Sequence, residues 1–370
     1  MTDQSRTDQN PGAVRVLAEL IRRPYFWGII AVALLLAINV ARDPSYLGIT
    51  VGPTGNLVGN LIDILRATAP ILMIAVGMCL VIATGGIDLS VGSIMVVSGA
   101  VSMEFLKAAG PDSGIGATLG ALGLALAFGA ILGAINGALV AIVGLQPFIS
   151  TLVMMLAGRG LAKVITAGQN TSAVNGDFRW IANGYVIGLP VVFLLAIAIV
   201  LAISLLVRRS ALGLMIEAIG MDPQAARLAG VNRRALLFAV YIASGVLAGI
   251  AGVFATASVM TVDVSRTGYQ LELDAILAVV IGGTSLAGGK FNLAGSVVGA
   301  ILIATLDKTV VFLGVSSSAT PAFKAVVIVA LCLLQSQRVR NLLRRRTRLP
   351  LRPPTDPTPT NSHATKETVA

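Results

Sequence analysis

Long apolar runs separated by short polar segments recur along almost the whole of this 370-residue chain. Helices of about 20 apolar residues are long enough to cross a membrane. The pattern therefore predicts an all-α polytopic membrane protein with about ten transmembrane helices. We expect these spans at residues 24–41, 63–84, 93–107, 116–143, 148–167, 185–207, 236–259, 271–282, 293–313 and 321–334.

The composition agrees with a membrane protein. Hydrophobic residues make up 56% of the chain and charged residues 12%, whereas soluble domains carry about 25% charged residues. Gly129, Gly133 and Gly137 lie four residues apart, which predicts a smooth ridge for close helix packing. Cys79 and Cys332 lie within apolar runs, and we interpret them as core residues.

The net charge of +10 does not indicate a nucleic-acid partner, because the basic residues gather in three segments. These are the N-terminal segment 1–23, the central loop 208–234 and the C-terminal tail 337–370. Cytoplasmic segments of membrane proteins are rich in Lys and Arg. We therefore place all three segments, and both termini, in the cytoplasm. The tail is basic and then rich in Pro and Thr, so we expect it to be disordered.

The most unusual stretch contains Asp88 between glycines and apolar runs. An Asp at the centre of a membrane helix costs about 2.5 to 3.5 kcal/mol. Glycines can end a helix and let the backbone turn inside the protein. One hypothesis is a broken-helix element inside the membrane domain, and the alternative is a short surface loop. The helix-break glycines are Gly85, Gly86 and Gly92, with an echo at Gly282 and Gly283.

That echo is a weak internal repeat, and paired interrupted segments mark the substrate path in many transporters. Candidate residues for a translocation pathway are polar groups within or next to the apolar runs. They are Asp88, Ser90, Asn136, Gln146 and Gln169. A structural alternative is that Asp88 or Ser90 caps the helix that follows.

The sequence of the central loop predicts a short helix, because it contains residues typical of a helix start and of a helix end. Asp222 and Pro223 are typical of an N-cap followed by a first-turn proline. Good helix formers follow from Gln224 to Ala229, and Gly230 then favours a C-terminal stop. Such helix chemistry in a cytoplasmic loop predicts a docking element.

Three motifs resemble those of bacterial ABC sugar-importer permeases, the ribose, xylose, arabinose and galactose family. They are ATGGIDLSVG at 83–92, ALGLMIEAIGMDPQAARLAGV at 211–231 and LDAILAVVIGGTSL at 273–286, and the resemblance extends over residues 60–336. The segments LQPF at 145–148, LAGRG at 156–160 and ITAGQ at 165–169, together with QSQR at 335–338, are closest to the galactofuranose permease branch.

The resemblance implies a type II ABC importer-like permease in the bacterial inner membrane, and the apolar runs place its transmembrane domain at residues 24–336. A periplasmic or lipid-anchored sugar-binding protein would deliver a galactofuranose-like or other pentose or hexose sugar. ATP and Mg would bind a partner ATPase, and a second permease copy or a paralogue would complete the pathway. The implied ATPase-coupling residues are Glu217, Ala218, Gly220, Asp222, Pro223, Ala225, Ala226, Arg227 and Gly230.

The residues themselves indicate a non-catalytic subunit without a cofactor. The chain has no Gly-x-x-x-x-Gly-Lys-Ser/Thr motif for ATP, and its one histidine, His363, lies in the tail. We expect no catalytic or metal residues, and the acids Glu272 and Asp274 would point to different sides of a helix. The competing hypothesis is an ion-coupled secondary transporter that uses Asp88 as its proton or Na⁺ site.

Overall fold

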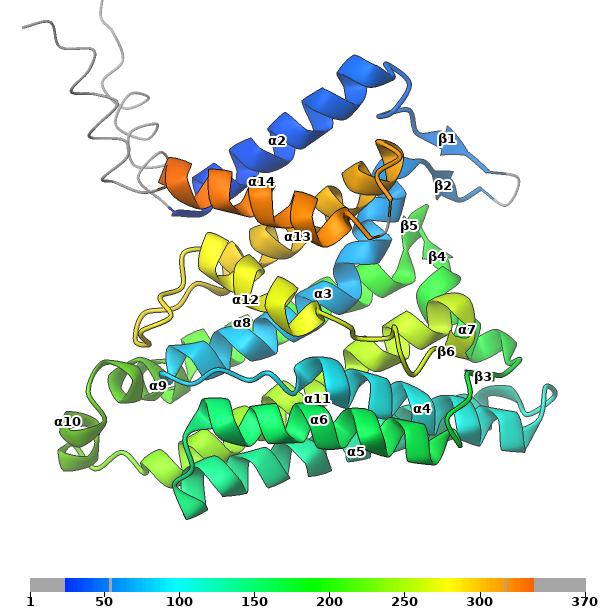
Figure 1. The fold of residues 1–370 in the computed structure, drawn as a ribbon. Coiled ribbons are helices and arrows are strands. Elements are labelled where there is room, and N and C mark those ends of the chain that lie inside the picture. Colours follow the sequence, from blue (N-terminus) through cyan, green and yellow to red (C-terminus); the bar gives the residue numbers. More distant parts are fainter. Residues whose placement is uncertain (1–23, 53–54, 317, 336–370) are drawn as a thin grey trace, which may run out of the picture.

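The structure is a computed structural model that describes residues 24–52, 55–316 and 318–335 (Figure 1). The predictions for the N-terminal segment 1–23 and the tail 337–370 lie outside the described residues.

Ten helices correspond one to one with the predicted spans, and most boundaries agree within three residues. Eight of them are long and apolar enough to cross a membrane. The exceptions are α12 and α14, so ten complete spans are not confirmed. The 11 residues of α12 rise only about 16 Å, against a hydrocarbon core of about 30 Å. The ten helices are α2 (Pro24–Arg42), α3 (Asn60–Ala83), α4 (Val91–Ala109), α5 (Gly114–Ala138), α6 (Pro147–Ile165), α8 (Val191–Arg209), α11 (Arg233–Val259), α12 (Leu271–Ile281), α13 (Leu293–Phe312) and α14 (Thr320–Gln335).

The connections carry short elements that give the bundle two different ends. Three two-stranded antiparallel sheets lie at one end, the strand end, and two helices lie at the opposite end, the α9–α10 end (Figure 1). A π-helical turn, η1 (Leu139–Val143), extends α5. The strands pair as β1 (Thr50–Val51) with β2 (Leu57–Val58), β3 (Thr171–Ser172) with β6 (Thr261–Val262), and β4 (Tyr185–Val186) with β5 (Leu189–Pro190); the helices are α9 (Leu212–Met221) and α10 (Pro223–Leu228).

The segment before α8 differs from the sequence-based expectation. A span was expected to begin at residue 185, but α8 begins at Val191, because Tyr185–Pro190 forms the β4–β5 hairpin around Gly188, whose φ is +77°. The polar segment upstream contains a helix that was not predicted, α7 (Gly176–Asn183). The side chain of Asn175 caps it by accepting a hydrogen bond from Phe178 N at 2.8 Å.

The long helix α11 lies at the centre and packs against α3, α4 and α5. Its contact with α5 confirms the predicted glycine ridge. A Cβ atom at Gly245 would overlap the carbonyl oxygen of Gly129, and one at Gly133 would crowd Tyr241 O. Small residues thus let the two backbones touch, and van der Waals packing between the backbones stabilises the contact. Cys79 is fully buried in this core, as predicted, whereas the side chain of Cys332 lies outside the described part.

Candidate functional site

The segment 84–90 between α3 and α4 runs inside the bundle. It leaves the α9–α10 end of α3 and returns toward the middle, where α4 begins (Figure 1). Gly85 takes a φ of +81°, which L side chains rarely adopt. Asp88 is 1% exposed and Ser90 is completely buried. The stretch is therefore an interior break between two helices, as the broken-helix hypothesis predicts, and not a surface loop.

Three donors surround the buried carboxylate of Asp88. Its Oδ1 accepts hydrogen bonds from Ser90 N at 3.0 Å and Ser90 Oγ at 2.5 Å. Its Oδ2 accepts one from Ser244 Oγ of α11 at 2.8 Å. Hydrogen bonds to a charged acceptor are roughly twice as strong as neutral ones, and they offset the cost of burying the carboxylate. Asp88 thus joins the break to the central helix.

Asn136 extends this network to α5 and α6. Its Nδ2 donates to Ser90 Oγ at 2.7 Å, and its Oδ1 accepts from Ser150 Oγ at 3.3 Å. We call Asp88, Ser90, Asn136, Ser150 and Ser244 the Asp88 network. It connects the break with α5, α6 and α11, and Ser244 of α11 lies 156 positions from Asp88 in the sequence. Three predicted pathway residues are thus brought together.

The capping alternative is wrong for Ser90, but Asp88 does accept a hydrogen bond from the backbone N–H of Ser90 directly before α4. Ser90 occupies the N-cap position of α4, but its φ of −82° and ψ of −12° are helical, and its side chain accepts no first-turn amide. N-cap residues that accept such bonds have extended dihedrals. Asp88 bonds to Ser90 and Ser244, so it holds the turn that precedes the helix.

The other two predicted pathway residues lie apart from this network. Gln146 is exposed just before α6, and Gln169 is exposed just after it. A 19-residue helix separates them by about 28 Å. Their role in transport stays a prediction.

Glycines of both breaks allow close approaches between segments. A Cβ atom at Gly86 would lie 2.9 Å from Tyr241 Oη, and one at Gly92 would overlap the carboxylate of Glu272. Gly282 packs directly on the backbone of Gly295, and Gly283 has a φ of +95°. Each break therefore contains a glycine at a contact too close for a side chain and a glycine with a positive φ.

The helix predicted in the central loop is confirmed. The side chain of Asp222 accepts hydrogen bonds from Gln224 N at 2.8 Å and Ala225 N at 3.1 Å, so it caps α10. Gly230, with a φ of +85°, ends the turn after it. The preceding helix, α9, was not predicted. Ala226 is buried, Glu217 and Ala218 are half-buried, and Pro223, Ala225 and Arg227 are exposed.

Gly220 of α9 meets both breaks at one junction. A Cβ atom there would overlap Ala83 O at the end of α3 and also Gly289 N in the loop after α12. Gly289 N donates to Ala83 O at 2.9 Å. Gly288 packs against the backbone of Gly85. A displacement of α9 must therefore move the end of α3 and the 283–292 loop with it, since interiors are close-packed.

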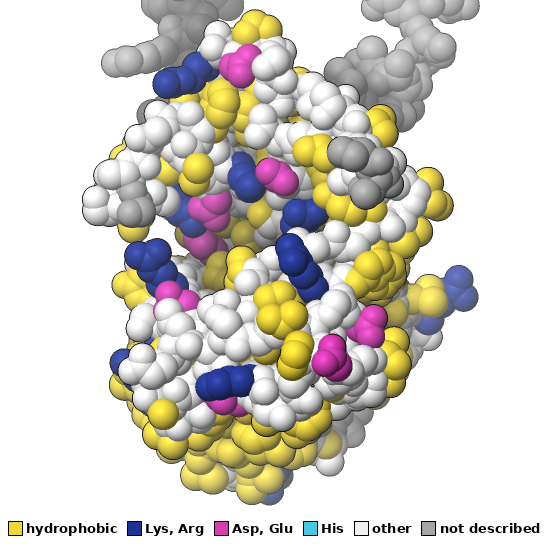
Figure 2. All heavy atoms as spheres, turned by 90° about the vertical axis from the view of Figure 1, so that its right-hand side faces the viewer, with side chains coloured by type: hydrophobic (Ala, Val, Ile, Leu, Met, Phe, Trp, Pro, Cys, Tyr) yellow, Lys and Arg dark blue, Asp and Glu magenta, His cyan; other side chains and the backbone are white. Residues whose placement is uncertain are grey.

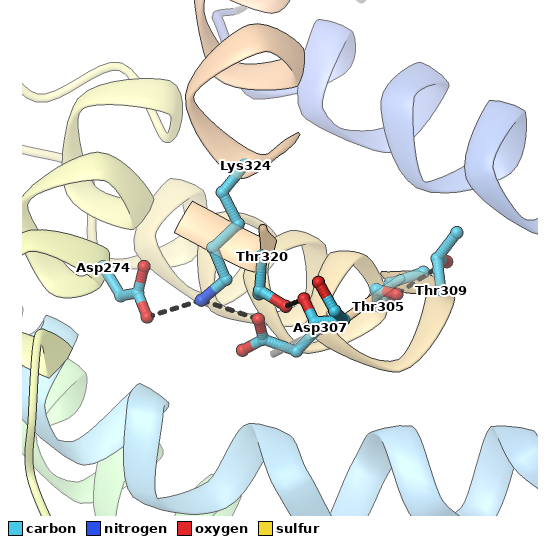
Figure 3. Close-up of polar contacts among 7 residues, drawn as sticks. Asp274, Thr305, Asp307, Thr309, Thr320 and Lys324 are labelled. Carbon is cyan, nitrogen blue, oxygen red and sulfur yellow. Dashed lines mark hydrogen bonds and ion pairs between the residues drawn. The ribbon is translucent and has the colours of Figure 1, made fainter. Parts of the chain in front are cut away.

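An ion cluster near the strand end was missed from the sequence. Lys324 of α14 points between Asp274 of α12 and Asp307 of α13, with N–O distances of 2.9 and 2.6 Å (Figure 3). The carboxylate of Glu272 faces Gly92 of α4 instead, so the two acids of α12 do point to different sides. Asp274 and Lys324 lie 50 positions apart, and no local sequence pattern could have predicted that they form an ion pair.

Replacing Lys324 with Ala is expected to destabilise the protein by on the order of 2 kcal/mol, because two partly buried carboxylates lose their counter-ion. Thermal unfolding of the purified protein in detergent measures this. Lys107→Ala is the control, since Lys107 is 61% exposed and its pair with Glu104 spans 3.8 Å; an exposed pair contributes less than about 1 kcal/mol. Equal melting temperatures for the two variants would contradict the expectation.

In the described ranges, no three or more His, Cys, Asp or Glu residues are grouped so that they could hold a metal ion.

Comparison with known proteins shows the family. The profile of the family described as "Branched-chain amino acid transport system / permease component" matches residues 60–335. A fructose import permease protein of Bifidobacterium longum is 50% identical, covering 92% of this chain and 95% of its own length. A galactofuranose transporter permease protein of Escherichia coli is 42% identical over 85% and 91% of the two chains. A ribose import permease protein of Escherichia coli is 39% identical over 84% and 93%.

No solved structure matches this chain. A galactofuranose permease is among the relatives, as the resemblance implied, but the fructose permease matches at higher identity. The family match covers α3 to α14, which includes the Asp88 network, the junction at Gly220 and the ion cluster. The chain therefore belongs to this family of transport-system permease components.

Proposed function

We propose that this chain is the membrane permease subunit of an ABC importer for a monosaccharide. The relatives, which are import permeases for fructose, galactofuranose and ribose, support the substrate class. The observation that carries the coupling mechanism is the junction at Gly220, where the α9 helix touches the segments after both α3 and α12. The chain itself then binds no ATP, and the nucleotide and Mg lie on a partner ATPase.

The α9–α10 end is the docking surface for that ATPase. Large apolar side chains are exposed there, with Leu214 at 74%, Met221 at 68% and Leu228 at 90% exposure. Apolar residues exposed together on a polar loop are typical of a protein contact. ATPase closure would push α9 against Ala83 and Gly289. Because Ala83 directly precedes the first break and Gly289 lies in the loop after α12, the push would reach the interior segment 84–90.

If the ATPase docks at the α9–α10 end, the orientation of the chain in the membrane and the positions of its other partners follow. The α9–α10 end and both termini face the cytoplasm, and the strand end faces the periplasm. A sugar-binding protein docks at the strand end. A second permease, either a copy of this chain or a paralogue, forms the other half of the pathway.

The test is uptake into vesicles. The permease is reconstituted with the ATPase and binding protein encoded beside it, and radiolabelled fructose, ribose and galactofuranose are supplied outside. We expect one of these sugars to enter only when ATP is present inside. Uptake driven by a proton or Na⁺ gradient without ATP would contradict the proposal, and so would a complete lack of sugar uptake.

Charge reversal at Glu217 is expected to lower ATP-dependent uptake by about tenfold or more, equivalent to about 1.4 kcal/mol of coupling. Glu217 lines a groove of about 310 Å³ with Arg208, Gly213 and Asn292, at the α9–α10 end. In the Glu217→Lys variant a second cation would face Arg208 in this groove. Co-purification of the ATPase and vesicle uptake measure the effect. Asn170→Lys, exposed at the strand end next to β3, is the control, and equal uptake in both variants would exclude a docking role for Glu217.

A further inference from the structure

A cavity opens at the strand end, outside the Asp88 network. Its volume is about 430 Å³, which falls within the range of about 300 to 1,000 Å³ for small-molecule sites. The start of α3, the end of α11, the start of α12 and the end of α13 form most of its wall. Figure 2 shows the hollow in this face, with acidic and basic side chains side by side around it.

Four charged residues line the cavity among those the structure describes, and their formal charges cancel. Asp63 and Arg66 lie on α3, and Asp307 and Lys308 lie on α13. Lys308 Nζ is 3.5 Å from Asp63 Oδ2. Asp307 contacts Lys324, which also neutralises Asp274 behind the wall. Two carboxylates and two cations give the lining no net charge.

These charged groups keep unused hydrogen-bonding capacity. The side chains of Asp63, Lys308 and Asp307 are 47%, 38% and 35% exposed. Arg66 Nη2 donates to Tyr185 Oη at 2.6 Å, but its Nε is buried and has no hydrogen-bond partner in the part of the chain that the structure describes. The carboxylate of Asp88, in contrast, is fully engaged by protein donors. The cavity wall can therefore bind a polar ligand, whereas the Asp88 network cannot do so without breaking its own bonds.

The rest of the lining is apolar. Ile71, Met95, Phe254 and Leu271 contribute to it. A sugar has hydroxyl groups, each able to donate and accept, and C–H faces that pack on apolar side chains. Carboxylates accept from hydroxyl groups, while Arg and Lys donate to them. A wall with both signs of charge matches a neutral polyol better than an ion, which would meet a like charge wherever it bound.

We infer that this cavity is where the permease itself binds the sugar that it receives, and that its charge-paired wall selects a neutral polyhydroxyl ligand over an anionic sugar derivative. This rests on the proposed function. The permease would then select its sugar at this cavity, in addition to the selection made by the sugar-binding protein.

The test is ligand protection of a thiol in the cavity wall. Ala255 lines the cavity and is half-buried. Ala255→Cys is made in a Cys79→Ser, Cys332→Ser background, and the purified permease–ATPase complex is labelled with a maleimide. We expect the transported sugar to slow labelling by up to about tenfold as it saturates the site. The same sugar as a phosphate ester should give no protection. Ala109→Cys, exposed at the end of α4, is the matched control and should be labelled at one rate throughout.

The charged wall is tested in the same assay. Adding Asp307→Asn or Lys308→Gln to the Ala255→Cys protein should raise the sugar concentration for half-protection by about tenfold, the loss of one good charged hydrogen bond. Lys107→Gln, an exposed residue of α4, should leave it unchanged. If Ala255→Cys does not transport, Ala67→Cys on the α3 wall replaces it.

The outcomes separate the two proposals. If ATP-driven uptake works but neither wall thiol is protected by the transported sugar, the cavity is not the binding site, although the importer assignment stands. Equal protection by the phosphate ester would overturn the selection for neutral ligands. If no sugar is taken up by the complete assembly, the proposed function itself fails.

Discussion

Uptake by a Gly220→Ala permease is expected to fall by at least about a hundredfold, which corresponds to about 2.7 kcal/mol. A single methyl group at this position would overlap Ala83 O and Gly289 N. Both are backbone atoms joined by a hydrogen bond of 2.9 Å, so neither can move aside as a flexible side chain would. The α9 helix must then separate from the junction. Sugar uptake measures the loss, and ATP hydrolysis by the assembled complex is measured beside it.

The matched control is Gly160→Ala. Gly160 lies inside α6, and a Cβ atom there has no neighbouring atom within 4 Å. Alanine in a helix interior is more favourable than glycine by about 0.5 to 1 kcal/mol, so this variant should fold and transport normally. The expected signature at Gly220 is a complex that still assembles but hydrolyses ATP without moving sugar. Normal uptake by Gly220→Ala would show that α9 does not transmit motion through this contact.

Local signals explain which features could be predicted from the sequence. The ten helices follow from runs of apolar residues, and the α10 helix follows from Asp222, Pro223 and Gly230, whose effects act within one turn. The glycine ridge of α5 was also evident, because spacing along one helix determines which residues share a face. Each of these depends on neighbours within about ten residues.

The missed features depend on partners that are remote in sequence. The polar helix α7 is stable because Phe178 and Ala182 are buried in the bundle and Asn175 caps it, although its composition is that of a loop. The cluster around Lys324 joins three helices, and Gly220 meets residues 137 and 69 positions away. A single sequence gives no measure of such pairings. The same limit means that the sequence could not show that Gln146 and Gln169 lie beyond opposite ends of α6, apart from Asp88.

Asp88→Ala is expected to lower the free energy of unfolding by several kcal/mol and to abolish uptake. Ser90 N and Ser244 Oγ would lose the acceptor that holds the break against α11. Each buried donor left without a partner costs about 1 to 3 kcal/mol. Thermal unfolding in detergent and vesicle uptake measure the two effects. Asp112→Ala, an exposed acid in the loop after α4, is the control and should change neither.

Asp88→Asn separates a structural role from ion coupling. The amide oxygen can still accept from Ser90, and its NH₂ group can donate to Ser244 Oγ, which is able to accept. Asparagine cannot release a proton and binds Na⁺ far more weakly than a carboxylate. We therefore expect Asp88→Asn to retain ATP-driven uptake within about threefold, the cost of exchanging charged for neutral hydrogen bonds. A well-folded Asp88→Asn protein without uptake would contradict this expectation and would mean that transport requires the charge of Asp88, whereas the ion-coupled mechanism would in addition require uptake by the unaltered protein that is driven by a proton or Na⁺ gradient without ATP.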